Sequence, residues 1–435
     1  MSACELNSGL TPPWQRIRTA ERWSEHRTAC PKTSYRGAIS MATRTYPMNA
    51  AGLHCVPRAR FTVCHFTTVH NQLKSRSYHM QCKPLADAGI GIHFVSPAMV
   101  HDGCRNVNFV RLPARAGLVN RLTALPSLLR VLLGTRASLY HFQDPELLLA
   151  AFAMKLVFRK RIVFDCYEDF SSMAYTARGV PQILRAPLSQ LTAAIQKFAA
   201  HCFDGFMTAD PFTMRRVGHA GKSAKLTFYN FPNQDFFPAP RSCVKEFDLV
   251  YRGGLSDRAG TWLLLEAARL LAVRGRPIRL LLIGYCDDSR VESALRERIR
   301  DLGLGTSVEL HGRIGHEQMA KILSRARIGI CPLQDTPKFR VNIPVKVFEY
   351  WACGLPVIAS DLPPIRPFFK NVGGGLLFAP GDVRALAQSI AWLLNHPQSA
   401  DRMGQRGRAA IESRFTHRNE VRKLLKFFSH IAAST

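Results

Sequence analysis

Short runs of apolar and β-branched residues alternate with helical patterns along most of the chain. Between residues 60 and 231, strands are predicted at FTVCHFTTV, IGIHFVSP, SLYHF, RIVFDCY, DGFMTAD and LTFYNF, with helical spacing of apolar positions between them. A second series begins at FDLVYRGGL and continues through IRLLLIGYC, SVELHGRI, IGICPL, PVIAS and GGLLFAP. Because a helix between successive strands is a crossover connection, each series predicts a doubly wound, parallel α/β sheet.

The domain boundaries follow from these two series and from the length of 435 residues, which is enough for two domains. We expect a Rossmann-like domain over 59–235, a linker rich in proline and asparagine over 236–245, and a second Rossmann-like domain over 246–395. The helical region 396–435 is expected to pack back toward the first domain. Residues 1–58 lack periodicity and carry scattered arginines, which fits a disordered extension, a transit peptide or a wrongly assigned start. A ligand is expected in a cleft between the domains, at the carboxyl ends of the strands.

The composition is that of a globular protein with an unusual charge. Hydrophobic residues make up 47% of the chain and charged residues 21%, but the formal net charge is +28. Such a field attracts anions. We expect an anionic membrane surface or a phosphorylated substrate and not nucleic acid, because no basic run is interleaved with aromatic residues. No run is long enough to cross a bilayer, the start does not resemble a signal peptide, and the 12 cysteines lack metal-binding spacing, which together favour a reducing, cytoplasmic location.

One stretch, LVNRLTALPSLLRVLLGTR from Leu118 to Arg136, interleaves leucine and valine with arginine. This pattern is typical of a basic amphipathic helix that lies in a membrane interface. A core-facing helix with arginines on its outer face explains the pattern equally well. The net charge favours the first interpretation, and with it peripheral contact with the inner face of the cytoplasmic membrane.

The stretch NIPVKVFEYWACGLPVIAS, from Asn342 to Ser360, predicts a helix that turns at once into a buried strand. Proline suits the first turn and glycine the end, so the helix should run from Pro344 to Cys353. Its spacing places Lys346, Glu349 and Tyr350 opposite the apolar residues. This arrangement indicates a ligand-binding wall, and the alternative is an ordinary exposed ion pair between the lysine and the glutamate.

The segment YRGGLSDRAG, at the end of the first strand of the second series, has the residues of a phosphate-binding turn. Gly253 and Gly254 permit a ligand to approach the backbone closely. Arg258 lies near the start of the next helix, where backbone N–H groups and the helix dipole favour phosphate. A plain tight turn is the alternative.

Two segments of the first series place carboxylates at strand ends. HFQDPELL contributes Asp144, and FDCYEDF contributes Tyr167, Glu168 and Asp169. A tyrosine can exchange hydrogen bonds with a sugar hydroxyl but cannot act as a base near neutral pH, so base catalysis would depend on one of the carboxylates. The alternative role for Asp144 and Glu168 is to cap the following helices.

Together these segments resemble the retaining GT-B glycosyltransferases, in the branch that writes Asn-x-x-Pro-x-Lys-x-Phe-Glu-Tyr followed by Gly-x-Pro-Val-Ile. HFQDPELL and FDCYEDF are similar to this branch's His-x-His-Asp-Pro-Glu and Asp-Val-His-Glu-Asp segments, and HFTTVHNQLKSR is similar to its first acceptor-side loop. The resemblance extends from about residue 60 to residue 428. It implies two Rossmann-like domains facing a central cleft, a nucleotide-diphosphate sugar as donor, and a glycan or lipid-linked acceptor in surface polysaccharide assembly.

The resemblance also implies roles for single residues. The donor would be bound by Gly253, Gly254, Arg258, Lys346 and Glu349, with the glutamate on the ribose hydroxyls. The catalytic residues would be Glu168, Asp144 and Tyr167. His70 and Arg76 would lie on the acceptor side. Because basic side chains can stabilise the departing diphosphate and no Asp-x-Asp cluster occurs, neither a metal nor another cofactor is expected. The chain departs from the family pattern at Val341, Gly254, Ala259 and Tyr167.

Two other functions are compatible with this sequence. A nucleotide-sugar 2-epimerase also uses two Rossmann-like domains, and the four departures fit a catalytically silent protein that binds nucleotide sugars. A Rossmann dehydrogenase is disfavoured because no Gly-x-Gly-x-x-Gly follows the first strand of either series.

Overall fold

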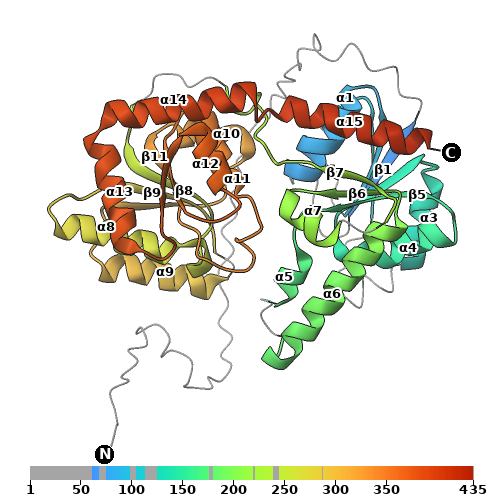
Figure 1. Cartoon of the computed structure of the whole chain (residues 1–435), viewed down its shortest axis with the longest axis horizontal. Helices are drawn as coiled ribbons and strands as arrows, with labels where there is room; N and C mark the ends of the chain where they lie inside the picture. The colour runs from blue at the N-terminus through green and yellow to red at the C-terminus, as the bar shows by residue number, and fades with distance from the viewer. Residues whose placement is uncertain are drawn as a thin grey trace, which may run out of the picture. The chain divides into compact units, whose positions relative to one another are not determined.

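The computed structural model describes most of the chain from residue 61 onward. The described residues are 61–67, 75–97, 104–112, 125–175, 180–218, 221–238, 244–286 and 288–434. The expected N-terminal extension and the predicted acceptor-side residue His70 lie outside them. The described residues form two α/β domains, each built on one parallel sheet (Figure 1).

The first sheet has seven parallel strands in the order β3-β2-β1-β4-β5-β6-β7. The strands are β1 (Thr62–Phe66), β2 (Gly91–Ser96), β3 (Val107–Arg111), β4 (Leu139–Phe142), β5 (Arg161–Cys166), β6 (Gly205–Thr208) and β7 (Ala224–Thr227). All six predicted strands are present, although β7 begins and ends earlier than predicted. Sequence reasoning missed β3, because this edge strand is only partly buried and lacks a continuous apolar run.

The second sheet has six parallel strands in the order β10-β9-β8-β11-β12-β13, and all six were predicted. The strands are β8 (Phe247–Gly254), β9 (Leu280–Tyr285), β10 (Val308–His311), β11 (Ala326–Cys331), β12 (Val357–Ser360) and β13 (Gly375–Phe378). In both sheets the strand order reverses beside the first strand of the series. That reversal confirms the doubly wound fold and places the binding edge at the carboxyl ends of β1 and β4 and of β8 and β11.

Helices connect the strands. In the first half they are a π-helix (Ser75–Cys82) continued by α1 (Lys83–Asp87), α3 (Leu125–Gly134), a 3₁₀ turn (Pro145–Leu147) continued by α4 (Leu148–Leu156), α5 (Phe170–Tyr175), α6 (Gln182–Cys202) and α7 (Pro211–Val217). In the second half they are a 3₁₀ turn (Asp257–Ala259), α8 (Thr261–Val273), α9 (Ser289–Asp301), α10 (His316–Leu323), α11 (Val345–Ala352), α12 (Arg366–Val372), α13 (Val383–Asn395), α14 (Pro397–Ser413) and α15 (His417–Ala433). Side-chain caps start α7, α9, α13 and α15.

The last helix, α15, packs on the first sheet and completes its core. Its apolar face shares one buried cluster with residues of β1, β2, β4, β5 and β6. The buried carboxylate of Glu420 also accepts a hydrogen bond from the backbone N–H of Tyr229, at 3.0 Å. The chain therefore returns to its first sheet after the second sheet is complete.

His417, the first residue of α15, makes this packing sensitive to acid. Its ring is buried near Phe228, and neither ring nitrogen has a hydrogen-bond partner among the described residues. Burial lowers the pKa of His417 from 6.5 to about 4. In the unfolded chain this histidine is protonated below about pH 6.5, whereas in the folded chain it stays neutral down to about pH 4. The free energy of unfolding therefore decreases as the pH falls through this window.

We therefore expect His417→Phe to make unfolding less dependent on pH. From about pH 7.5 to about pH 5, the variant should lose about 2 kcal/mol less unfolding free energy than the wild type. Urea titrations at the two pH values measure the difference, and His201→Phe, at an exposed position, is the control. An equal loss in both proteins would contradict the assignment of acid sensitivity to His417.

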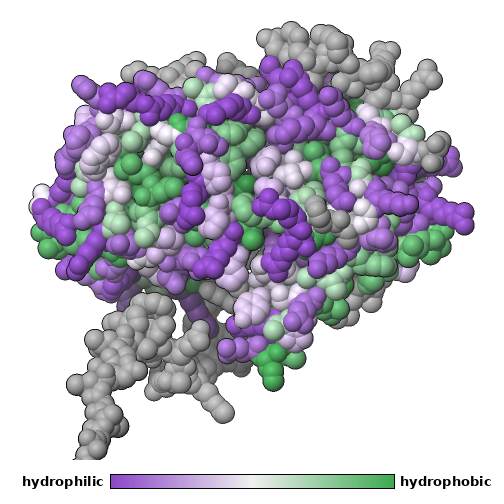
Figure 2. Space-filling model, in the orientation of Figure 1, coloured by the Kyte–Doolittle hydropathy of each residue, from purple (hydrophilic) through white to green (hydrophobic). Residues whose placement is uncertain are grey.

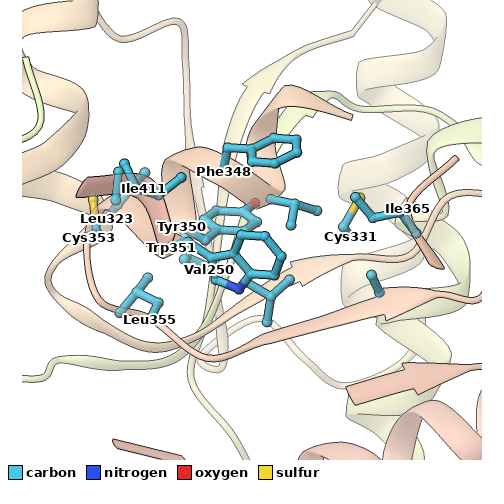
Figure 3. Packing of buried hydrophobic residues seen from close by; sticks show 14 of the residues in the cluster. Val250, Leu323, Cys331, Phe348, Tyr350, Trp351, Cys353, Leu355, Ile365 and Ile411 are labelled. Carbon is cyan, nitrogen blue, oxygen red and sulfur yellow. The ribbon is translucent and has the colours of Figure 1, made fainter. Parts of the chain in front are cut away.

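The core of the second domain is assembled around α11 (Figure 3). The side chains of Phe348, Tyr350 and Trp351 are almost completely buried, and they pack with residues from β8, β11 and α14. The Trp351 indole donates a hydrogen bond to the Gly374 carbonyl at 2.9 Å. The predicted helix from Pro344 to Cys353 is confirmed, with these two residues as its caps.

The basic stretch proposed for a membrane interface is only partly described. Its described part contains α3, which turns Leu128 and Leu132 into the core and leaves Arg130 exposed. This is the core-facing arrangement that was the alternative interpretation. No helix in the described ranges has both the length and the apolar character needed to span a membrane.

Candidate functional site

Lys346 lies over the glycine turn that ends β8. Its ammonium donates a hydrogen bond to Tyr251 Oη at 3.0 Å and lies 4.2 Å from the centre of that ring. The Tyr251 hydroxyl in turn donates to the Gly254 carbonyl at 2.8 Å. Gly253 has a φ of 145°, which strains any other residue, and a side chain there would displace the ammonium. These contacts hold a cation at the carboxyl end of β8, where open parallel sheets bind ligands.

Glu349 is buried, and only one of its two carboxylate oxygens has a hydrogen-bond partner among the described residues. Its side chain is 2% exposed, and Oε1 accepts a hydrogen bond from Arg252 Nη2 at 2.7 Å. Among the described residues, Oε2 has no partner. A buried charged acceptor without a partner is costly, so this oxygen is suited to a ligand hydroxyl.

The prediction that α11 presents an open polar face is wrong for Glu349 and Tyr350. Tyr350 is completely buried, and its hydroxyl accepts a hydrogen bond from the Arg252 backbone N–H at 2.8 Å and donates one to the Ile330 carbonyl at 3.2 Å. The physical reason is that α11 packs between the second sheet and α14, which leaves no solvent-facing side at these positions. An ordinary surface pair between Lys346 and Glu349 is excluded, because Glu349 pairs with Arg252.

The turn after β8 is shaped by close backbone contacts. Gly260 has a φ of 79°, and any side chain there would collide with the Pro332 carbonyl, so the loop after β11 lies against this turn. Arg258 is exposed in the 3₁₀ turn that precedes α8, whereas Gly254 faces open space. Ala259, one of the predicted departures from the family pattern, is buried. Arg258 and Lys346 therefore bring positive charge to this edge from two different elements.

The carboxylates of the first sheet have three different environments. Asp144 Oδ2 accepts a hydrogen bond from Thr67 Oγ1 at 2.5 Å, and its side chain does not cap the turn that follows. Asp169 does cap: its Oδ1 accepts hydrogen bonds from the backbone N–H groups of Ser171 and Ser172 at 3.2 and 3.3 Å, and their hydroxyls also donate to this carboxylate. The helix-capping alternative is therefore wrong for Asp144, and after β5 it is Asp169, for which no capping role was predicted, that caps.

Glu168 lies beside a lysine of the second domain. Its Oε2 is 3.2 Å from Nζ of Lys338, which belongs to the segment between β11 and α11. Burial, and then the charges of Glu168 and Asp144, raise the pKa of the neighbouring Tyr167. Tyr167 therefore keeps its proton near neutral pH, in agreement with the prediction that it cannot act as a base.

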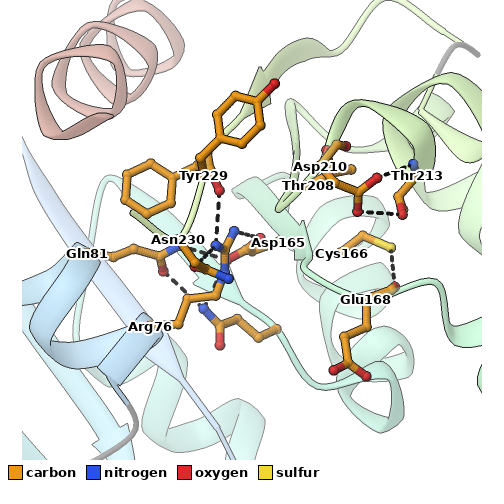
Figure 4. A network of polar contacts seen from close by, with 12 residues as sticks. Arg76, Gln81, Asp165, Cys166, Glu168, Thr208, Asp210, Thr213, Tyr229 and Asn230 are labelled. Carbon is orange, nitrogen blue, oxygen red and sulfur yellow. Dashed lines mark hydrogen bonds and ion pairs between the residues drawn. The ribbon is translucent and has the colours of Figure 1, made fainter. Parts of the chain in front are cut away.

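Arg76 and Asp165 form the centre of a buried polar network (Figure 4). Arg76 donates Nε to Asp165 Oδ2 at 2.9 Å and Nη2 to Oδ1 at 2.8 Å. Gln81 and Gln143 also donate to Oδ2, at 2.7 and 3.0 Å. The remaining donors of Arg76 reach the Phe228 carbonyl at 3.0 Å and the side chain of Asn230. Arg76 was predicted on the acceptor side; this network gives it a structural role, and contact with an acceptor stays a prediction.

His141, the first residue of HFQDPELL, is also enclosed. Its Nδ1 lies 3.0 Å from Nδ1 of His65, and both rings are buried. Burial lowers the pKa of His141 to about 4, although the nearby Asp165 acts in the opposite direction. His141 is therefore neutral near pH 7, and the two histidines belong to the core of the first domain.

Sequence reasoning missed three contacts that organise these sites, although it weighed Arg252 as an alternative to Arg258. Tyr251 holds Lys346, Arg252 holds Glu349, and Asp165 holds Arg76. A polar contact of Tyr251 could have been predicted, since the hydroxyl of a tyrosine in a buried strand such as β8 needs a hydrogen-bond partner. The other two pairings join residues about 90 positions apart or more, and no local pattern indicates them.

Comparisons with known proteins give a family match for the second half of the chain. Residues 233–410 match the family described as glycosyl transferases group 1, a segment that contains all of the predicted donor-site residues. The amylovoran biosynthesis glycosyltransferase AmsK of Erwinia amylovora is 28% identical over 179 residues, which is 41% of this chain and 43% of that protein. The chain thus matches less than half of the length of this relative.

Two solved structures share the whole architecture. Sucrose-phosphate synthase from Thermosynechococcus elongatus superposes with a TM-score of 0.71 at 18% identity, covering 86% of this chain and 100% of that one. HepE from Anabaena, in complex with UDP and glucose, superposes with a TM-score of 0.68 at 13% identity, covering 85% and 100%. At these identities the likeness establishes the fold: the chain has the GT-B arrangement of two parallel-sheet domains.

Proposed function

We propose that this chain is a retaining glycosyltransferase that moves a sugar from a nucleotide-diphosphate sugar to a glycan or lipid-linked acceptor. Its product would enter an exopolysaccharide, a capsule or a lipopolysaccharide. The observation that carries the proposal is that α11 brings two groups to the end of β8: the ammonium of Lys346, held by Tyr251, and the buried Oε2 of Glu349, which has no partner among the described residues. The match to group 1 glycosyl transferases over the same residues and the name of the amylovoran relative support the reaction class.

The donor site would divide its tasks between charge and hydrogen bonding. Lys346 and Arg258 would face the diphosphate, where cations fixed in advance stabilise the negative charge that grows on the leaving oxygens. Gly253 would leave room for the phosphates beside the ammonium. Glu349 Oε2 would accept a hydrogen bond from a ribose hydroxyl, while Arg252 holds the carboxylate in place through Oε1. A site without a metal stays a prediction.

The acceptor side would use the strand ends of the first sheet. Asp144 is fixed by Thr67, and Glu168 is partly exposed, so these carboxylates are the candidates to accept a proton from the attacking hydroxyl. Tyr167 would orient a sugar hydroxyl. Asp169 is already engaged by two serines and Arg216, which makes it a poorer candidate for the base.

Transfer assays with the purified chain test the proposal. Labelled nucleotide-diphosphate sugars are supplied with glycan or polyprenyl-linked acceptors, and NMR establishes the anomeric configuration of the product; we expect the donor's configuration to be retained. An isomerised donor formed without acceptor would instead support the epimerase. Nucleotide binding without any turnover would support the silent binding protein.

Glu349→Ala should weaken nucleotide binding about tenfold to a hundredfold, because hydrogen bonds to a charged group contribute about 1.5–3 kcal/mol. Arg252 is 28% exposed and can be solvated in the variant, so the fold should persist. Calorimetric titration with nucleoside diphosphates measures the affinity. Glu292→Ala, which breaks an exposed pair with Arg296, is the matched control. Equal affinities for the wild type and Glu349→Ala would refute the role of this carboxylate.

A further inference from the structure

Helix α6 has its apolar side turned outward. Its packed side consists of small and polar residues, and the fully buried ones are Gln196, Ala199 and Ala200. Its outer side carries six large hydrophobic residues that are 37% to 83% exposed: Ile183, Leu184, Leu188, Leu191, Ile195 and Phe198. A surface helix normally buries its apolar face, so this inversion calls for a partner.

The apolar surface continues onto the neighbouring helices. The ring centroids of Phe198 in α6 and Phe152 in α4 are 5.3 Å apart. Helix α5 packs directly on α6. The end of α4 exposes Leu156, Val157 and Phe158, and α5 exposes Met173 and Tyr175. In the described part of the chain, twelve of the sixteen exposed large hydrophobic residues lie on or directly beside these three helices. Figure 2 shows hydrophobic residues over the lower end of α6, in the orientation of Figure 1.

The charged side chains within α4, α5 and α6 are all basic, although Lys155 of α4 pairs with Asp204, which follows α6. Arg159, Lys160, Arg185 and Lys197 flank the exposed apolar residues, whereas α4, α5 and α6 contain no aspartate or glutamate. Cations beside an acid-free apolar face match a bilayer interface that carries anionic lipid headgroups. They disfavour self-association, because a second copy would bring the same positive charges into contact. The formal net charge of +28 acts in the same direction.

We propose that the outward face of α6, with the adjoining ends of α4 and α5, docks this protein onto an anionic bilayer. The leucine, isoleucine and phenylalanine side chains enter the interfacial layer, and the arginines and lysines contact phosphate headgroups. This proposal depends on the proposed function only for the reason why the protein would bind a membrane, which is access to a lipid-linked acceptor. Its test needs neither donor nor acceptor, so the two proposals can fail separately.

Flotation of the full chain with vesicles tests the proposal. We expect binding to vesicles of phosphatidylcholine with about one third phosphatidylglycerol, and little binding to phosphatidylcholine alone. The double variant Leu184→Asp/Leu191→Asp should lower the bound fraction at least about tenfold. The control Val244→Asp/Val273→Asp changes two exposed valines of the second half, at 80% and 70% exposure, and should bind like the wild type.

A second variant keeps the test decisive if the double variant misfolds. In Leu191→Trp, brominated lipids in anionic vesicles should quench the added fluorescence, whereas Val273→Trp should add no quenched signal. Equal flotation of the wild type and the α6 double variant would overturn the proposal, as would equal binding to neutral vesicles. A wild-type dimer that Leu184→Asp/Leu191→Asp converts to a monomer would assign the surface to a second copy instead.

Discussion

Lys346→Met is expected to lower kcat/KM for sugar transfer by about a hundredfold or more. Methionine is one atom shorter than lysine and can still pack on the Tyr251 ring, so the substitution removes the charge together with the hydrogen bond to Tyr251 Oη. That charge lies against Gly253, in a position to stabilise a departing diphosphate. Because the negative charge on the leaving oxygens grows toward the transition state, the loss should affect kcat as well as KM.

Initial rates with a saturating acceptor measure this loss. Lys370→Met, at an exposed position on α12, is the matched control and should retain full activity. Thermal unfolding of Lys346→Met should remain close to that of the wild type, since its ammonium is only partly buried. An unchanged kcat/KM in a folded variant would remove Lys346 from the donor site, and with it the main support for the proposed function.

The sequence was sufficient for the fold because local signals and the global arrangement agree. Strands such as LLLIGY are continuous apolar runs, as expected for strands buried on both faces of a parallel sheet, and glycines end several helices. The same reasoning located the turn after β8 and the helix from Pro344 to Cys353. Both features depend on residues adjacent in sequence, whose conformational preferences are intrinsic.

The environment of the site residues could not be predicted in the same way. Helical spacing placed Glu349 on an exposed face, but the contact between α11 and α14 buries that face and Arg252 neutralises the carboxylate. Spacing likewise predicts a buried apolar face for α6, whereas that face is exposed. In both helices, the elements that pack on them decide which residues are buried, and those elements come from distant parts of the sequence.

The same dependence on distant residues governs the largest expected effect on stability, which is that of Arg76→Met. This substitution should lower the free energy of unfolding by about 3–5 kcal/mol, because it leaves the buried Asp165 carboxylate without its counter-ion. In the wild type, burial alone would raise the pKa of Asp165, but the charge and hydrogen bonds of Arg76 outweigh burial and hold the pKa below its usual value. Lys83→Met breaks an exposed pair with Asp87 and should cost less than about 0.5 kcal/mol.

The pH dependence distinguishes a lost counter-ion from lost packing. Without Arg76, burial should raise the pKa of Asp165, so that a proton can neutralise the carboxylate in mildly acidic solution. The difference in unfolding free energy between the wild type and Arg76→Met should therefore shrink as the pH falls from about 7 toward about 4.5. Urea titrations across this range measure it. A difference that stays constant with pH would mean that Arg76 stabilises the domain through packing against Phe228 and not through its charge.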